Sequence, residues 1–371
     1  MAIESHPVYN TSHWNSLWPD NHAFFRPVGC EAGNRRRPSH KRNMAISIQA
    51  TRSAEGLRPV DIARDLPQIV ELLKTVFGDT LDGNEQHVFG DGGGKAANEL
   101  YYRFHPSAQR LLNGFVWQED GRIVGNATVL ATKSWDRYLV ANVAVHPSYR
   151  RRGIARALMR AITASIQSRG GRVILLQVVK DNHSAIDLYH SLGYTYIGNM
   201  TTWYVMASRI RQIPDLIGEG TYIDVCQLPN GRWREAYELD ISHVQADLNW
   251  PEPLQPNAYH RTLWRKTSDF LNGRLYEGWA VLDSGNRLAG LTTIAGEWGR
   301  SHVLTLRVRP DSAGSLERPL LAKAIRRLHL LPRRNVRVDH PETDEATGQL
   351  LRDANFSVQR VLTHMRLDIS R

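Results

Sequence analysis

The sequence predicts an α/β fold that consists of two copies of one domain type. Between residues 57 and 206, apolar segments with the periods of strands and helices alternate. Three landmarks of this segment recur further along the chain at a nearly constant spacing: Gly114 recurs as Gly278, Pro147 as Pro310, and Tyr194 as Phe356. Such spacing over separated landmarks is the signature of an internal repeat.

The first copy begins with a predicted helix and a hairpin. Apolar residues from Ile69 to Val76 follow the helical period, and we expect Asp65 to cap this helix and Gly78 to end it. Strands are predicted over 115–117 and 123–130, joined by a hairpin turn at Asp120 and Gly121. The segment 79–95 between them, which contains three consecutive glycines, is predicted to be a mobile loop.

The rest of the first copy alternates strands and helices. Residues 138–145 and 173–179 predict strands, and apolar residues at four-residue spacing predict a helix over 154–166. A further helix is expected over 184–192, and two final strands are expected over 194–206.

Composition excludes several classes of protein. The chain of 371 residues carries 47 Lys and Arg against 37 Asp and Glu, a net charge of +10. Residues 1–43 lack the pattern of a signal peptide, and no apolar run approaches the ~20 residues that span a bilayer. Two cysteines, Cys30 and Cys226, exclude a disulfide framework and are typical of a reducing compartment, so we expect a cytoplasmic protein.

The most informative segment follows the strand that ends at Pro147. A short polar turn leads to a helix that opens at Gly153, where the first N–H groups lack intrahelical partners and the helix dipole is positive. Gly153 and Ala155 leave room for a phosphate to approach the backbone. Four arginines add positive charge: Arg150, Arg151, Arg152 and Arg156. The pattern predicts a pyrophosphate site, with a merely solvated basic helix end as the alternative.

These residues resemble the signature of the GNAT superfamily of acyl-CoA-dependent N-acetyltransferases. Its pattern Arg/Gln-x-x-Gly-x-Gly/Ala is matched by Arg150, Gly153 and Ala155. Residues 182–194 also fit the family's pattern Asn-x-x-Ala-x-x-Leu-Tyr-x-x-x-Gly-Phe/Tyr. The resemblance covers residues 56–206, and the second copy only in outline. It implies two tandem GNAT-type domains, each with a mixed, mostly antiparallel sheet flanked by helices.

The resemblance also implies acetyl-CoA as co-substrate and no metal. Backbone groups of the strand end would pair with the pantetheine arm, the following turn would hold the pyrophosphate, and Asn182 would bond the pantetheine. The implied cofactor-binding residues are Val143, Ala144, Val145, Arg150, Arg151, Arg152, Gly153, Ile154, Ala155 and Asn182. A neutral amine would attack the thioester, and Tyr189 would protonate the departing thiolate. The alternative for Tyr189 is a ring packed into the core.

The general base is left open. Relatives that acetylate the N-termini of ribosomal proteins have a Glu five residues before the Asn, where this chain has Gln177. Asn142, at a strand position that is acidic in some members, is also an amide. The remaining candidates are a water relay or one of these side chains: Asp79, Glu85, Asp91, His146 and His183.

The second copy has lost the residues that carry this chemistry. Residues 312–318 lack the phosphate pattern, and Asp344, Leu351 and Asn355 stand opposite Asn182, Tyr189 and Gly193. We therefore expect a flexible extension over residues 1–43, a catalytic domain over 44–208 and a degenerate GNAT-like domain over 209–371. The degenerate domain would complete the fold and wall the acceptor site, with Asp339, His340 or residues 250–253 reaching the cleft.

The expected reaction is acetyl transfer to an amine of a small molecule. Trp203 and Tyr204 are candidate acceptor contacts, with a role in the core as the alternative for both. The alternatives are acetylation of a protein N-terminus or lysine, and a non-catalytic acyl-CoA-binding sensor. A nucleic-acid-binding protein is a further alternative, but one basic cluster lies at a predicted helix start rather than among aromatic residues on a surface. No specific nucleic acid and no membrane are expected as partners, and the oligomeric state is left open.

Overall fold

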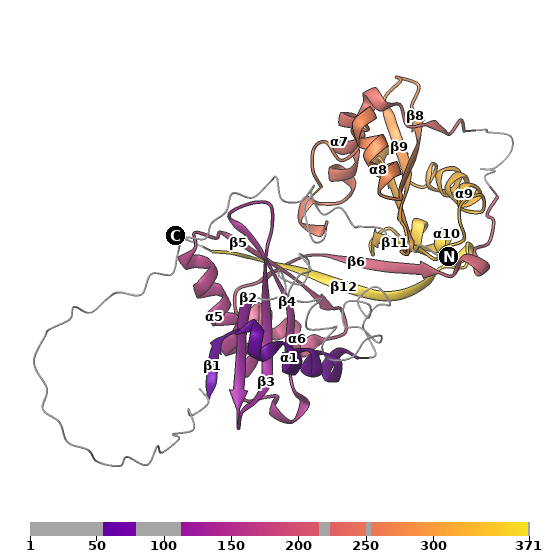
Figure 1. The fold of residues 1–371 in the computed structure, drawn as a ribbon. Helices are drawn as coiled ribbons and strands as arrows, with labels where there is room; N and C mark the ends of the chain where they lie inside the picture. Colours follow the sequence, from indigo (N-terminus) through magenta and orange to yellow (C-terminus); the bar gives the residue numbers. More distant parts are fainter. Residues whose placement is uncertain (1–54, 79–112, 215–222, 250–253, 370–371) are drawn as a thin grey trace, which may run out of the picture. The chain divides into compact units, whose positions relative to one another are not determined.

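The computed structural model describes residues 55–78, 113–214, 223–249 and 254–369, and the structural statements below refer to these (Figure 1). They form one mixed sheet of twelve strands with flanking helices. The expected α/β class and mixed sheet are confirmed. Three sets of predictions lie outside the described residues: the extension over 1–43, the loop over 79–95 with its acidic residues, and residues 250–253.

The first half contains six strands and three helices among the described residues. They are β1 (Gly56–Pro59), α1 (Ile62–Phe77), β2 (Asn113–Glu119), β3 (Arg122–Ala131), β4 (Arg137–Val145), α5 (Ile154–Ser168), β5 (Val173–Val179), α6 (His183–Ser191) and β6 (Thr195–Val205). The second half repeats this order with β7 (Cys226–Gln227), α7 (Trp233–His243), α8 (Leu263–Leu271), β8 (Arg274–Leu282), β9 (Leu288–Glu297), β10 (His302–Val308), α9 (Glu317–Leu328), β11 (Val336–Pro341), α10 (Glu345–Asp353) and β12 (Ser357–Asp368). Short 3-10 turns lie at η3 (Pro147–Tyr149), η4 (Ala207–Arg209), η5 (Asn230–Arg232), η6 (Ala246–Leu248) and η7 (Pro310–Ser312).

Two local predictions are corrected by the structure. The cap of α1 is Asp61, whose side chain accepts a hydrogen bond from the N–H of Ala63, whereas Asp65 lies inside the first turn. Asp65 is buried and forms an ion pair of 2.6 Å with Arg58, a role that its sequence position alone does not distinguish from capping. Residues 194–206, expected to form two strands, form the single long strand β6.

The predicted hairpin is confirmed. Asp120 and Gly121 join β2 to β3 with positive φ angles of 49° and 75°, the conformation of a tight two-residue hairpin turn. Gly78 ends α1 as expected. No helix among residues 55–78, 113–214, 223–249 and 254–369 is long and apolar enough to cross a membrane.

The strand order shows the internal repeat directly. It runs β1-β2-β3-β4-β5-β12-β6-β11-β10-β9-β8-β7, so that each strand of one half stands where its counterpart stands in the other half. Within this sheet the parallel pairs are β4 with β5 and β10 with β11, and the remaining neighbours are antiparallel. The helices α6 and α10, at 183–191 and 345–353, have the same length and are separated by the spacing of the repeat at both ends.

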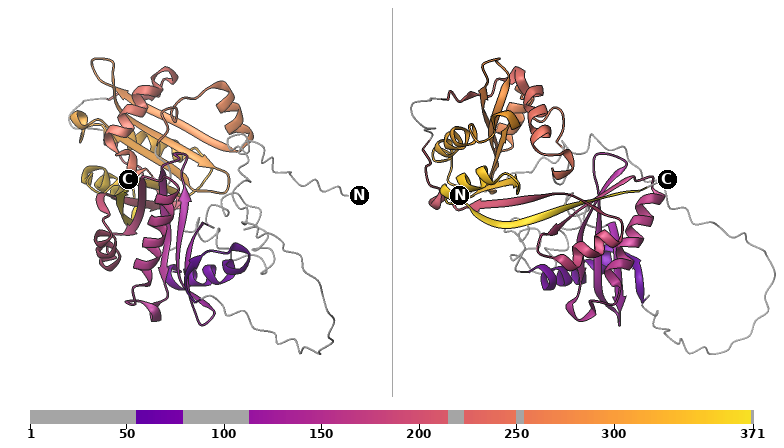
Figure 2. Two further views of the ribbon diagram at one scale, coloured as in Figure 1. Left: turned by 90° about the vertical axis from the view of Figure 1, so that its left-hand side faces the viewer. Right: turned by 180° about the vertical axis from the view of Figure 1, so that it is seen from behind.

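The two halves share their central strands. β12, at the end of the chain, pairs with β5 of the first half, and β6 pairs with β11 of the second half (Figures 1 and 2). The exchange is symmetric in detail: the N–H of Lys180 donates to the carbonyl of Val361, and the N–H of Glu342 donates to that of Asn199, over 3.0 and 3.1 Å. Lys180 and Glu342 occupy equivalent repeat positions and form an ion pair of 2.6 Å. The sheet therefore does not break at residue 208.

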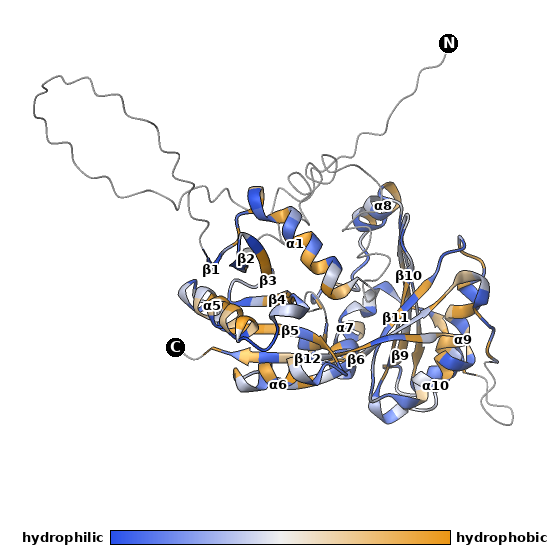
Figure 3. Cartoon of the chain, turned by 90° about the horizontal axis from the view of Figure 1, so that it is seen from below, coloured by the Kyte–Doolittle hydropathy of each residue, from blue (hydrophilic) through white to orange (hydrophobic). Residues whose placement is uncertain are grey.

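Helices cover both faces of each half of the sheet. Ile123 of β3 packs with α1, whereas its neighbour Val124 packs with α5, so these helices lie on opposite faces. In the second half, Ala280 packs with α7 and Val281 packs against Leu320 of α9. Both α1 and α5 carry apolar and polar sides, as Figure 3 shows by hydropathy.

We predict that Met365→Ala in β12 lowers the free energy of unfolding by about 2–4 kcal/mol. Met365 is fully buried in the core that α5 and β5 form in the first half, although it lies near the end of the chain. Denaturant titration followed by circular dichroism measures the change. The control Val358→Ala, on an exposed side chain of the same strand, should change it by less than about 0.5 kcal/mol. An equally small effect at Met365 would contradict the exchange of strands.

Candidate functional site

The candidate site lies where β4 and β5 separate. Their parallel pairing joins residues 137–140 to residues 173–176 and then stops, so β4 has an open edge beyond Val140. A cavity of about 800 Å³ occupies this opening. Its walls come from the ends of β4 and β5, from the start of α6, and from residues 358–362 of β12.

A bulge in β4 accompanies the separation. Asn126 of β3 faces Ala144, but Thr128 faces Ala141, so β4 holds one extra residue there. Asn142 takes the left-handed conformation with φ 53°, which asparagine tolerates better than most residues. The buried Asn126 side chain donates to the Asn142 carbonyl over 2.9 Å and stabilises the bulge. A bulge bends its strand, which agrees with β4 turning away from β5. An asparagine inside each of the two paired strands, Asn126 and Asn142, is the sequence signal for this bulge.

The turn after β4 presents backbone N–H groups at the start of α5. Arg151 and Gly153 have positive φ angles of 64° and 79°, and no side chain caps the helix. Arg152 forms an ion pair of 3.0 Å with Glu119, and Arg156 donates to Ser191 over 2.8 Å. Arg150 donates to the carbonyl of Val145 over 3.2 Å. Three of the four arginine side chains are thus oriented by contacts within the protein. They lie near the first N–H groups of α5, which have no intrahelical partner.

The structure brings together some of the expected site residues but not all of them. Val143, Asn182 and Tyr189 line the cavity. The other implied residues lie outside its lining, on the end of β4, in the turn that follows it and at the start of α5: Ala144, Val145, Arg150, Arg151, Arg152, Gly153, Ile154 and Ala155. Asn182 also caps α6, because its side-chain oxygen accepts from the N–H of Ala185 over 3.2 Å.

Tyr189 packs in the core and also borders the cavity. It lies on α6, is 5 % exposed, and packs in the first-half core with its ring centroid 5.8 Å from that of Tyr194. It also borders the cavity. Burial raises the pKa of the Tyr189 hydroxyl, so the phenol stays protonated at neutral pH. That is the state a proton donor requires.

A histidine that sequence reasoning missed lies beside Gln177. Nε2 of His364, on β12, is 2.9 Å from Nε2 of Gln177, which lines the cavity. An amide nitrogen only donates, so the histidine nitrogen accepts this hydrogen bond and is unprotonated. Burial lowers the pKa of His364 to about 4, which keeps the imidazole neutral. The two residues are 187 positions apart, and only the strand exchange brings them together.

The remaining candidate residues that the structure describes do not line the cavity. His146 caps the turn after β4, since its Nδ1 accepts from the N–H of Ser148 over 3.3 Å, and it does not line the cavity. His183 is exposed at the start of α6. Neither Trp203 nor Tyr204 lines the cavity: Trp203 is buried in the core of the second half, which agrees with the core alternative, and the Tyr204 hydroxyl is hydrogen-bonded to Asn335. Strand β6 carries both residues away from the cavity because it pairs with β11.

The corresponding place in the second half is built differently. The pairing of β10 with β11 also stops, after Leu304 and Val338. At the start of α9, however, the carboxylate of Glu317 accepts from the N–H of Gly314 over 2.9 Å, so a negative charge already occupies that turn. Leu351, fully buried, stands where the first half has Tyr189. Among the described residues of the second half, these contacts leave no comparable phosphate or thiol site.

Comparisons with known proteins agree with this geometry. Residues 85–194 match the model of the acetyltransferase (GNAT) family. Ribosomal protein bS18-alanine N-acetyltransferase of Escherichia coli (strain K12) is 34% identical over 86 residues, which cover 23% of this chain and 56% of that relative. The same enzyme of Shigella flexneri matches over the same extent. The chain thus spans little more than half the length of these curated relatives.

A solved structure extends the likeness of fold to the second half. The GCN5-related N-acetyltransferase from Sphaerobacter thermophilus covers 85% of this chain and 96% of its own, with a TM-score of 0.55 and 16% sequence identity. This likeness concerns the fold alone. The chain therefore contains a GNAT-family domain, and the GNAT resemblance of the sequence is confirmed.

We predict that the free energy of unfolding falls as the pH drops from about 6.5 toward 4. Burial lowers the pKa values of both His340 and His364 to about 4, whereas an unfolded histidine titrates near ~6.5. Between these values the unfolded chain binds more protons, so acid favours unfolding. Denaturant titrations at several pH values measure the slope. His364→Asn should flatten it, while His183→Asn, at an exposed position, should not; equal slopes in all three proteins would contradict the assignment.

Proposed function

We propose that this protein transfers an acetyl group from acetyl-CoA to an amine. The observation that carries the proposal is the opening between β4 and β5, with Tyr189 in its wall and the N–H groups of the α5 turn directly after β4. An open strand edge offers hydrogen bonds to an extended amide-containing chain such as pantetheine. A helix start with free N–H groups suits a pyrophosphate.

The chain's own residues divide the binding of acetyl-CoA among them. The backbone of residues 143–145 pairs with the pantetheine arm, and the turn over 150–155 binds the pyrophosphate. Asn182 uses its oxygen to cap α6, so its amide N–H groups remain for the pantetheine. Arg151 supplies charge at the turn, and within the described residues its guanidinium has no ion pair.

Tyr189 is the proposed proton donor. The amine nitrogen attacks the carbonyl carbon of the thioester, the carbon–sulfur bond breaks, and the electron pair leaves with sulfur. Tyr189 protonates this thiolate, and a backbone N–H near Val145 stabilises the oxyanion on the way. The products are the acetylated amine and free CoA.

Gln177 is proposed to position the acceptor amine. His364 accepts the amide N–H of Gln177, so the amide oxygen is the group left to accept a hydrogen bond from the amine. Gln177 does not act as a base, and neither His146 nor His183 lines the cavity. Deprotonation of the amine is left to water or to an acidic side chain, either in the cavity wall (Asp181, Glu342) or outside the described part of the chain (Asp79, Glu85, Asp91).

The acceptor is proposed to be a small molecule. Residues 358–362 and Glu342, all from the second half, wall the cavity that Tyr189 borders. This supports residues 44–208 as the catalytic domain and residues 209–371 as a degenerate domain that closes the site.

We place the protein in the cytoplasm, where acetyl-CoA is available and cysteines stay reduced.

Acetylation of a protein N-terminus is the second candidate. It is favoured by the curated relative, whose name gives an alanine of ribosomal protein bS18 as its acceptor. Gln177 stands against it, because the carboxylate expected of such enzymes is absent at this position. A panel of small amines and of peptides with free N-termini, followed by release of free CoA, separates the two. Binding of acetyl-CoA without turnover on either set would instead favour a sensor.

We predict that Tyr189→Phe lowers kcat by about 100-fold or more while the Kd for acetyl-CoA stays the same. The hydroxyl is the group removed, and the ring still fills the core. Release of free CoA measures kcat, and calorimetry measures Kd. Tyr196→Phe, at a largely exposed tyrosine on β6, serves as the matched control and should leave both unchanged. An unchanged kcat in Tyr189→Phe would show that another group protonates the thiolate.

A further inference from the structure

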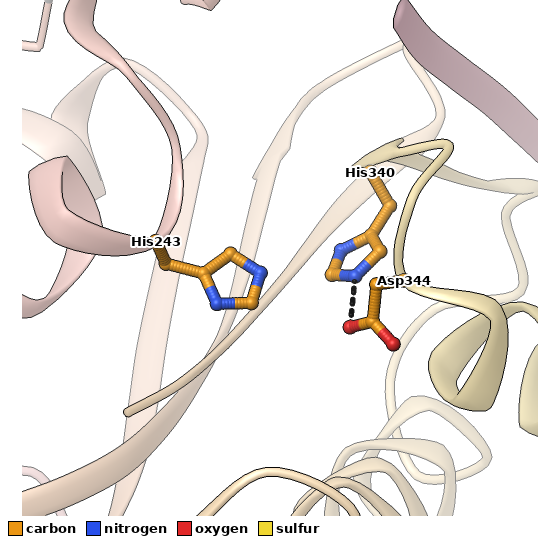
Figure 4. Close-up of side chains that lie close together, drawn as sticks. All are labelled: His243, His340 and Asp344. Atoms are coloured by element: carbon orange, nitrogen blue, oxygen red, sulfur yellow. Dashed lines mark hydrogen bonds and ion pairs between the residues drawn. The ribbon is translucent and has the colours of Figure 1, made fainter. Parts of the chain in front are cut away.

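A cluster of two histidines and an aspartate lies where β10 and β11 separate in the second half. His243 ends α7, His340 lies on β11, and Asp344 caps α10. One ligand atom from each lies within 4.8 Å of the others, and Figure 4 shows the two rings turned toward one another. The ring centroids are 5.4 Å apart. The proposed function uses none of these side chains.

The hydrogen bonds of the cluster determine which ring nitrogens carry lone pairs. Nδ1 of His243 lies 3.0 Å from the carbonyl of Val308, which only accepts, so Nδ1 is protonated and Nε2 holds the lone pair. Nε2 of His340 lies 2.8 Å from the carboxylate of Asp344, and it therefore donates. Nε2 is thus the atom of His340 that faces Asp344, and an ion bound by both residues would replace the proton on Nε2, leaving His340 protonated on Nδ1, an atom that is buried with no hydrogen-bond partner among the described residues.

Burial and charge favour a cation in this position. His340 is 1 % exposed, and burial lowers the pKa of His340 to about 4 and also lowers that of His243, so both rings are neutral. Arg307 is the nearby positive charge, and it is paired with the buried Asp240 over 2.5 Å. The negative charge of the Asp344 carboxylate is thus available to balance the positive charge of a bound cation. Hydrogen bonds from Thr347 to both oxygens of Asp344, 3.0 and 2.7 Å long, hold the carboxylate in place.

We propose that His243, His340 and Asp344 bind a divalent transition-metal ion of the zinc type. Neutral imidazole and carboxylate are ligands that Zn²⁺ accepts at about 2.0–2.2 Å, and a carbonyl partner on the second nitrogen of a histidine is typical of such sites. The ligand atoms lie within 4.8 Å of one another, so the widest of these separations needs to shorten by at most about 1.5 Å to reach the spacing of a tetrahedral site. With three protein ligands, a water molecule completes a tetrahedral site.

The ion would connect α7, β11 and α10 at the place where β10 and β11 separate. This place corresponds to the opening between β4 and β5 in the first half. Val308, whose carbonyl His243 bonds, corresponds to Val145 of the first half in the internal repeat. Asp344 corresponds to Asn182 in the same way, and each of these two residues caps its helix. The same opening between strands therefore serves a co-substrate in one half and a structural ion, joining α7, β11 and α10, in the other.

The test uses the full chain without a histidine tag, freed of metal by a chelator and dialysed. Titration with Zn²⁺ against a chromophoric chelator is expected to give one tightly bound ion per chain. Co²⁺ is expected to give the intense visible bands of a tetrahedral site. His243→Ala and Asp344→Asn should each weaken Zn²⁺ binding by about 100-fold or more and remove those bands.

Two features keep the test decisive. Asp344→Asn preserves the cap of α10, since Asn182 caps the equivalent helix of the first half, so this variant is expected to fold, which circular dichroism checks. His329→Ala removes an exposed histidine from the same half and should leave Zn²⁺ affinity unchanged. Absence of tight binding, or binding that His243→Ala and Asp344→Asn leave intact, would overturn the proposal.

Discussion

The exchange of β6 and β12 is the interaction on which the rest of the structure depends. Each of these strands leaves the half that precedes it in the chain and pairs with the other half. A strand edge that lacks a partner exposes a row of unsatisfied backbone groups. β5 and β11 would each present such an edge without the strand of the opposite half. The two halves consequently fold as one sheet, and the apolar core under α5 includes Met365 from the end of the chain.

The exchange also determines the surroundings of the candidate site. β12 supplies residues 358–362 of the cavity wall and the buried His364 that holds Gln177. The second half thus contributes residues to the candidate site of the first. In the second half, Glu317 accepts the N–H of Gly314 at the turn that corresponds to the proposed phosphate turn, while the sheet remains continuous through both halves.

Local sequence patterns predicted most of the first-half elements. Apolar spacing and the Asp120-Gly121 turn predicted β2, β3, α5, β5 and α6 closely, because these elements depend on neighbours in the chain. The prediction failed for β6, whose residues 195–205 form one strand rather than two. Both partners of β6, β11 and β12, come from the end of the second half, so the strand continues without a local turn.

The sequence alone identified the repeat and the family resemblance, and it predicted Tyr189, Asn182 and the turn over 150–155 as site residues, because motifs of adjacent residues carry that resemblance. The arrangement of the strands shows which of these residues meet: Val143, Asn182 and Tyr189 line one cavity, while the turn lies outside its lining. It also decided the bulge at Asn142, the His364–Gln177 pair and the histidine cluster of the second half. These features join residues far apart in the chain, and their positions follow from strand pairing that leaves no local pattern.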